Sequence, residues 1–190
     1  MSSANAAPAA PVVVALIGLP CSGKTVVARA LAEEFGLQRV CRDEIRAVMF
    51  PACSYSYAEK RAAFRALLLA VEVNCVLGRG TVIDGMTFSR RRDLERLDAT
   101  LAPYRVSPLA IFLDCPPETA RMRVLKDLQT GRHAAADRTP ELVDEIMARF
   151  DPPPASCVVL DARLRAELLV EAARQAVRAR TGLQGRVIDL

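Results

Sequence analysis

Eight consecutive residues near the start of the chain carry the clearest chemical signal in the sequence. The segment Gly18-Leu-Pro-Cys-Ser-Gly-Lys-Thr25 matches the pattern G-x-x-x-x-G-K-[ST] in full. Its glycines let the backbone curl so that successive N–H groups point at phosphate oxygens, and a helix that begins there adds its dipole to the same anion site. Lys24 can reach the outer phosphates, and the Thr25 hydroxyl can bind Mg²⁺. The loop therefore predicts a nucleoside triphosphate site made by Gly18, Leu19, Pro20, Cys21, Ser22, Gly23, Lys24 and Thr25.

Two further groups of polar residues follow predicted strands. Asp84 ends an apolar run and can hold Mg²⁺ or a water molecule bound to it, although an aspartate at a strand end also serves as a turn former or a helix cap. Asp43 and Arg46 share one face at the start of a predicted helix. The carboxylate can accept the proton of an attacking hydroxyl group, and the arginine can bind a substrate anion. A helix cap with an ion pair inside the helix is the open alternative.

An alternation of strands and helices positions these residues. Apolar runs predict strands at residues 12–17, 38–41, 81–84, 109–114 and 157–161. Apolar residues at three- and four-residue steps, bounded by glycine and proline, predict helices at 25–35, 43–50, 58–77, 89–101, 140–150 and 166–178, and another that begins at 115–117. A polar segment at residues 127–138 lies between two helices. Because strands alternate with helices, the chain predicts an α/β fold whose parallel sheet is covered on both faces.

Composition fits one soluble domain. The 190 residues are 52% hydrophobic and 25% charged, which excludes collagen-like, coiled-coil and disordered classes. The 26 basic and 22 acidic residues are evenly spread along the sequence, so a small-molecule ligand is favoured over a long polynucleotide.

Six scattered cysteines predict free thiols in the cytoplasm, and no apolar run reaches the roughly 20 residues of a membrane span. We divide the chain into a disordered tail (1–11), one domain (12–180) and a loosely ordered tail (181–190).

The successive motifs resemble those of the small P-loop kinases. The matching blocks are the loop at residues 18–25, Arg42-Asp43-x-x-Arg46, Thr81-Val-Ile-Asp-Gly85, Phe112-Leu-Asp-Cys-Pro116 and Arg149-Phe-Asp-Pro-Pro153. They are most similar to the branch that contains the kinase domain of polynucleotide 5′-hydroxyl kinases and many bacterial kinases. Gluconate kinases, adenylylsulfate kinases and zeta toxins are more distant. The resemblance implies a three-layer P-loop NTPase fold with five parallel strands in the order 2-3-1-4-5 and a small helical lid at about residues 121–150.

The resemblance also implies a role for each site residue. Asp43 is the general base, and Arg46 positions the acceptor. Lys24 stabilises charge on the transferred phosphoryl group, while Asp84 lies in the outer shell of the metal site. The lid of this family carries arginines that close over the nucleotide, often as R-x-x-R in the helix after the fourth strand. Arg123 and Lys126 stand where that pair falls here, and Arg132 and Arg138 in the polar segment behind it are further candidates.

The activity implied is an ATP-dependent kinase that acts on a hydroxyl group of a small molecule or of a nucleic-acid 5′ end, with ATP and Mg²⁺ as cofactors. We expect residues 51–57, with Tyr55 and Tyr57, to line the acceptor side together with Met86, Thr87 and Arg90. We expect the chain to act as a monomer. The alternative is a nucleotide-binding regulatory module with slow or incidental ATPase activity. Such a module needs no general base at the position of Asp43.

Overall fold

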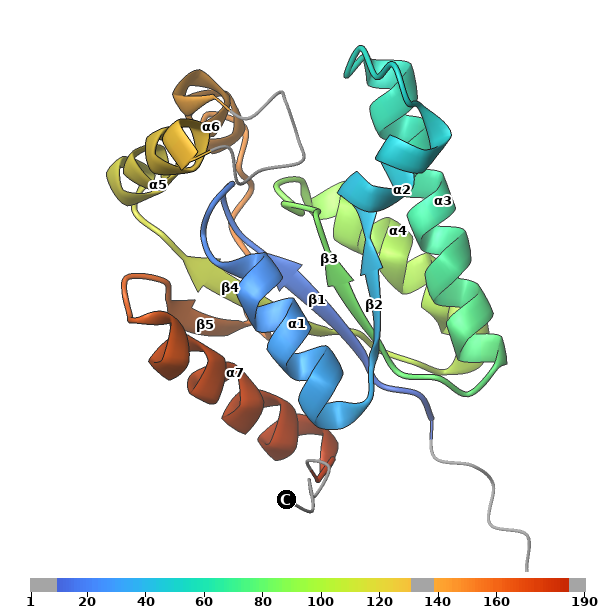
Figure 1. Ribbon diagram of the computed structural model, residues 1–190. Coiled ribbons are helices and arrows are strands. Elements are labelled where there is room, and N and C mark those ends of the chain that lie inside the picture. Colours follow the sequence, from blue (N-terminus) through green and yellow to red (C-terminus); the bar gives the residue numbers. More distant parts are fainter. Residues whose placement is uncertain (1–9, 131–138, 185–190) are drawn as a thin grey trace, which may run out of the picture.

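A five-stranded parallel sheet lies between two layers of helices in the computed structural model, which describes residues 10–130 and 139–184 (Figure 1). The strands are β1 (Val13–Ile17), β2 (Gln38–Cys41), β3 (Thr81–Asp84), β4 (Leu109–Asp114) and β5 (Val158–Asp161). All neighbouring strands are parallel, and their order is β2-β3-β1-β4-β5. The predicted fold class and strand order are therefore confirmed.

Helices connect the strands at nearly the predicted places. They are α1 (Lys24–Phe35), α2 (Arg42–Met49), α3 (Tyr57–Val76), α4 (Arg91–Leu101), the short 3₁₀ helix η1 (Ala102–Tyr104), α5 (Pro117–Thr130), α6 (Pro140–Met147) and α7 (Ala166–Thr181). Residues 127–130 continue α5 rather than beginning the polar segment, because neither glycine nor proline interrupts the helix there. Residues 131–138, which hold most of that segment, lie outside the described residues.

The central strand explains why its sequence is a continuous apolar run. All five residues of β1 are at most 1% exposed. Its side chains alternate between two cores, because successive residues of a strand point to opposite faces. Val14 and Leu16 pack on the side of α1 and α7, whereas Val13, Ala15 and Ile17 pack on the side of α3 and α4 (Figure 1).

The parallel strands end at one edge of the sheet, and the segments after β1, β2 and β3 meet there. Gly85, which follows β3, is the point of closest approach. Its φ is 69°. A Cβ on Gly85 would lie 2.9 Å from Cys41 Sγ and 3.0 Å from the backbone nitrogen of Asp43. Because glycine has no Cβ, it lets the start of α2 lie close against the end of β3.

Four of the six cysteines have buried thiols of low reactivity. All six are free thiols. Burial raises the pKa of Cys41, Cys75, Cys115 and Cys157, and a thiol with a raised pKa stays protonated near neutral pH. Within the described residues, no helix combines the length and the apolar character that crossing a bilayer requires.

Candidate functional site

The glycine-rich loop has the curled backbone that its sequence predicts. Gly18 has φ of 146°, and a Cβ on it would lie 2.8 Å from both the Leu113 carbonyl oxygen and Ser22 Oγ. Gly23, just before α1, has φ of 101°. Cys21 also has a positive φ, of 57°, although it is not glycine. The two fixed glycines of the motif thus stand where the loop must turn, and the loop leads directly into the N-terminus of α1.

The ammonium group of Lys24 lies against the backbone of this loop. The side chain belongs to the first residue of α1, and the residue is 8% exposed. Its Nζ donates hydrogen bonds to the carbonyl oxygens of Gly18 (2.8 Å) and Leu19 (2.6 Å) and to Ser22 Oγ (3.4 Å). A buried ammonium interacts more strongly with an anion than one in bulk water, so this position suits the phosphates of a nucleotide.

Asp84 faces the same loop from the end of β3. The residue is 1% exposed. Its Oδ1 accepts hydrogen bonds from the Thr25 hydroxyl (3.1 Å) and the Gly85 N–H (2.7 Å), and its Oδ2 accepts one from Arg39 Nη1 (2.8 Å). Three donors therefore fix the direction of the carboxylate beside Thr25.

Arg39 is a part of this network that the sequence did not single out. Its guanidinium lies between the carboxylates of Asp84 and Glu44. Burial alone would lower the pKa of Arg39, but the hydrogen bond and charge of Glu44 and the hydrogen bond to Asp84 outweigh it and raise the pKa. Cys41 pairs with Asp84 across β2 and β3, and Arg39 lies two residues before Cys41 on the same face. The predicted strand order places these two strands side by side, but only their register brings Arg39 to Asp84.

Thr25 and Asp84 fit a magnesium ion. Both supply the hard oxygen atoms that Mg²⁺ prefers. In the ranges 10–130 and 139–184, no three His, Cys, Asp or Glu side chains gather as a metal site. Mg²⁺ in phosphoryl-transfer sites takes most of its ligands from water and phosphate, so two protein oxygens beside the loop are a suitable donor set.

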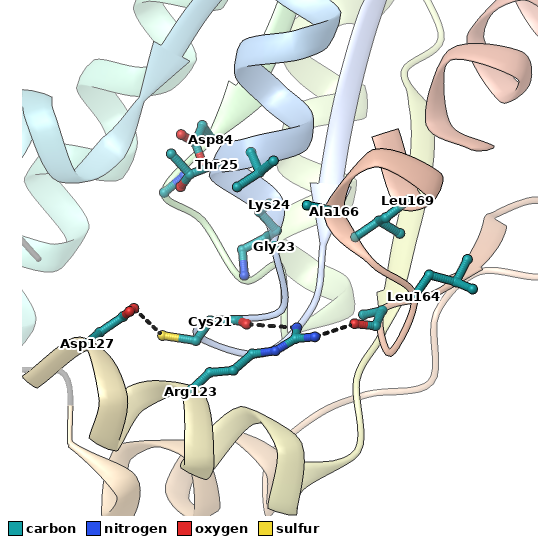
Figure 2. Close-up of a pocket in the computed structure, with 13 residues that line it drawn as sticks. Cys21, Gly23, Lys24, Thr25, Asp84, Arg123, Asp127, Leu164, Ala166 and Leu169 are labelled. Atoms are coloured by element: carbon teal, nitrogen blue, oxygen red, sulfur yellow. Dashed lines mark hydrogen bonds between the residues drawn. The ribbon is translucent and has the colours of Figure 1, made fainter. Parts of the chain in front are cut away.

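A cavity of about 380 Å³ extends from the loop toward α7 (Figure 2). Its polar end is formed by Lys24, Thr25 and Asp84. Its other end is apolar and includes Leu164 and Leu169, which lie after β5 and in α7. A cavity with charged groups at one end and apolar side chains at the other matches a ligand with a phosphate tail and an aromatic base.

Helix α5 closes one side of this cavity. Arg123 donates hydrogen bonds to the carbonyl oxygens of Cys21 (3.3 Å) and Ala162 (2.8 Å), so it links the phosphate loop to the segment after β5 (Figure 2). Asp127 lies one turn further and accepts a hydrogen bond from Cys21 Sγ (3.5 Å). Lys126, predicted to lie near the nucleotide, is exposed and is not part of the cavity wall. Arg132 lies outside the described residues.

Asp43 and Arg46 meet at the start of α2 on the other side of the loop. Arg46 Nη2 donates a hydrogen bond to Asp43 Oδ1 (3.0 Å), so the predicted ion pair within the helix is present. Arg46 is only 3% exposed, and its guanidinium lies 4.5 Å from the centre of the Tyr55 ring. Both residues also line a small cavity of about 50 Å³ together with Lys24. The structure thus brings the predicted base and the loop lysine to one cavity.

The residues predicted for the acceptor side surround Asp43. Met86 and Thr87 line the small cavity that holds Asp43 and Lys24. A second cavity of about 120 Å³ on the outer side of Asp43 is lined by Tyr55 and Cys53, among others. The remaining members of the predicted set, Tyr57 and Arg90, line a separate cavity that shares Met86 and Thr87 with the small cavity but does not include Asp43.

A parallel sheet in this strand order, with a glycine-lysine loop after its central strand, defines the P-loop kinase fold. The chain belongs to a family described as "AAA domain", whose model matches residues 13–153. The fold and the family confirm the resemblance that the motifs indicated. No curated protein sequence matched the chain.

Solved structures of kinases share this fold. A sugar kinase from Janibacter sp., without ligand, has a TM-score of 0.67 and 19% identity over 93% of this chain and 99% of its own. A gluconokinase from Sinorhizobium meliloti has a TM-score of 0.64 and 17% identity over 90% of this chain and 93% of its own. The APS kinase of Mycobacterium tuberculosis, in complex with AMPPNP and APS, has a TM-score of 0.67 and 18% identity over 90% of this chain and 97% of its own.

Proposed function

We propose that this protein transfers the γ-phosphoryl group of Mg-ATP to a hydroxyl group of an acceptor. The observation that carries the proposal is that Asp43 and Lys24 line one cavity beside the phosphate loop. A protein that only binds nucleotide has no use for a carboxylate at that place. The solved kinases of similar fold act on different acceptors, and one of them was crystallised with AMPPNP, which supports ATP as one of the two substrates.

The nucleotide binds across the cavity of about 380 Å³. Backbone N–H groups of the loop and Lys24 hold its phosphates, and its base lies against Leu164 and Leu169. Thr25 and Asp84 would hold Mg²⁺, which would supply positive charge against the phosphates of the nucleotide. Arg123 fixes the loop from the side of α5, and we assign α5 and α6 to the lid of the single domain.

The acceptor approaches from the side of Asp43. The Asp43 carboxylate takes the proton of the acceptor hydroxyl, whose oxygen then forms a bond to the γ-phosphorus. The bond from the γ-phosphorus to the oxygen that bridges it to the β-phosphate breaks, and ADP leaves with that oxygen. Lys24 stabilises the charge that spreads over the phosphoryl group, and Arg46 keeps Asp43 directed at the acceptor.

An assay of ATP turnover in the presence of acceptors tests this function. Purified protein is incubated with Mg-ATP labelled at the γ-phosphate and with sugars, nucleosides, antibiotics or 5′-hydroxyl oligonucleotides, and both ADP and labelled product are measured. A kinase forms ADP faster with its acceptor, in amounts equal to the labelled product. A regulatory module with incidental ATPase activity instead forms ADP slowly with every compound.

The variant Lys24→Ala provides the control for this assay. Because Lys24 is the charge over the phosphate loop, its removal is expected to abolish productive nucleotide binding and both products. Normal turnover by Lys24→Ala would contradict the assignment of the loop as the phosphate site.

A further inference from the structure

The cavity that Tyr57 and Arg90 line has a volume of about 220 Å³ and a wall made largely of basic side chains. We call it the basic cleft. Apart from Arg90, its basic residues are Arg42, Lys60, Arg61, Arg92, Arg96 and Arg149. They come from α2, from α3, from α4 and from the segment after α6, so the fold gathers charges that are far apart in the sequence.

Acidic groups offset only part of the positive charge of the basic cleft. Arg42 has Asp43 Oδ1 at 3.6 Å, Arg90 has Asp151 Oδ1 at 3.7 Å, and Asp93 is the one acidic residue in the wall of this cavity. Arg92 and Arg96 lie one turn apart on α4, where two like charges destabilise a helix. In the described part of the chain, neither of these two arginines has a carboxylate within 4.0 Å. Such a concentration of positive charge raises the local concentration of anions.

The basic cleft adjoins the cavity of the predicted base. Arg42, Met86 and Thr87 line both the basic cleft and the small cavity that contains Asp43 and Lys24. One ligand can therefore occupy the basic cleft with one end and reach Asp43 with the other. The nucleotide cavity is formed by different residues on the side of α5 and α7, so the basic cleft is not a part of the phosphate loop.

We propose that the acceptor is a small hydroxyl compound that already carries a phosphate group, and that the basic cleft binds this group while the hydroxyl lies at Asp43. The proposal rests on the proposed kinase function. Arginine forks bind phosphate through two parallel hydrogen bonds, and six of the seven basic residues in the wall are arginines. A volume of about 220 Å³ is enough for the phosphate end of a small molecule.

Binding of inorganic phosphate tests the basic cleft without knowledge of the acceptor. The protein is first saturated with Mg-AMPPNP, whose own affinity is measured, so that the phosphate loop is filled. Inorganic phosphate is then titrated and followed by ³¹P NMR. The double variant Arg92→Gln/Arg96→Gln is expected to bind phosphate at least about tenfold more weakly, because each arginine supplies charge-assisted hydrogen bonds.

The double variant Arg65→Gln/Arg79→Gln is the matched control. It removes the same net charge from exposed residues that line none of the described cavities around the site, and it is expected to bind phosphate like the unmodified protein. Equal phosphate binding by all three proteins, or no binding by the unmodified protein, would overturn the basic cleft as an anion site. A failure to bind AMPPNP would instead count against the proposed kinase function.

Paired acceptors test the substrate class directly. Ribose is compared with ribose 5-phosphate, glucose with glucose 6-phosphate, and adenosine with AMP, and a 5′-hydroxyl oligonucleotide is added. We expect a phosphorylated small acceptor to have a kcat/KM at least about tenfold above its neutral counterpart. This preference should disappear in Arg92→Gln/Arg96→Gln and persist in Arg65→Gln/Arg79→Gln. Equal use of a neutral acceptor, or preference for the oligonucleotide, would refute the proposal.

Discussion

Replacement of Gly85 by alanine probes the contact that places Asp43. Gly85 has φ of 69°, and a Cβ there would lie 2.9 Å from Cys41 Sγ, 3.0 Å from the Asp43 backbone nitrogen and 3.1 Å from that of Arg42. Ordinary van der Waals contacts begin at 3.4 Å, so the start of α2 must move away from β3. Gly78 offers a matched control, because its φ is 66° and a Cβ on it would meet nothing within 4 Å.

The two variants differ in the size of their effects. Both carry the conformational cost of a left-handed alanine, about 1 kcal/mol. Gly85→Ala adds the cost of overpacking, roughly 1–3 kcal/mol, so we expect it to be destabilised by about 2–4 kcal/mol in total. A displacement of a few tenths of an ångström at the base is expected to reduce kcat/KM about tenfold, given that about 1 Å can cost a hundredfold.

Urea unfolding and initial-rate kinetics measure these effects. Gly78→Ala should lose only about 1 kcal/mol of unfolding free energy and keep its phosphoryl-transfer rate. If Gly85→Ala has the stability and the kcat/KM of Gly78→Ala, then the start of α2 is not held against β3, and the geometry that brings Asp43 to the loop is refuted.

Two further predictions concern α5 and α3. Lysine cannot reproduce the two hydrogen bonds that Arg123 donates to Cys21 and Ala162, so Arg123→Lys should raise the KM for ATP about tenfold with a smaller change in kcat. An unchanged KM in initial-rate measurements would exclude this role. Hydrogen bonds from Ser54 and Ser56 hold the pKa of Glu59 at about 2, below its ordinary 4.5. The stability that Glu59 contributes is therefore present above pH 4.5 and lost as the pH falls toward 2. Glu59→Gln should therefore show a smaller acid-induced fall in Tm than the unmodified protein. Circular dichroism between about pH 2 and about pH 7 measures this difference.

The elements of this fold follow rules that act over a few residues, which is why the sequence predicts them well. The run at residues 12–17 predicts a strand buried on both faces, and β1 lies at the centre of the sheet. The glycines of the loop predict its curled backbone, and both have positive φ. The largest errors fall at helix ends, such as 127–130, where one or two turns of helix continue through residues that are also compatible with a loop.

The site depends on contacts between distant segments, which the sequence predicts only in part. The contact of Arg39 with Asp84 depends on the register of β2 against β3, which the predicted strand order does not specify. The basic cleft is a sharper case. Arg90, Arg92 and Arg96 are close together in the sequence, but only the packing of α2, α3 and α4 adds basic residues from distant segments to them. A small net charge in a sequence therefore does not exclude a concentrated charge in the fold.

The most direct test of the account compares ATP affinity and phosphoryl transfer in Asp43→Asn. Asparagine keeps the size of the side chain and an oxygen that can accept the hydrogen bond from Arg46, but it cannot take a proton from the acceptor. Calorimetric titration with AMPPNP should give an unchanged affinity, whereas transfer to the acceptor should fall at least about a hundredfold. Transfer at the original rate would show that Asp43 is not the base and would contradict the proposed mechanism.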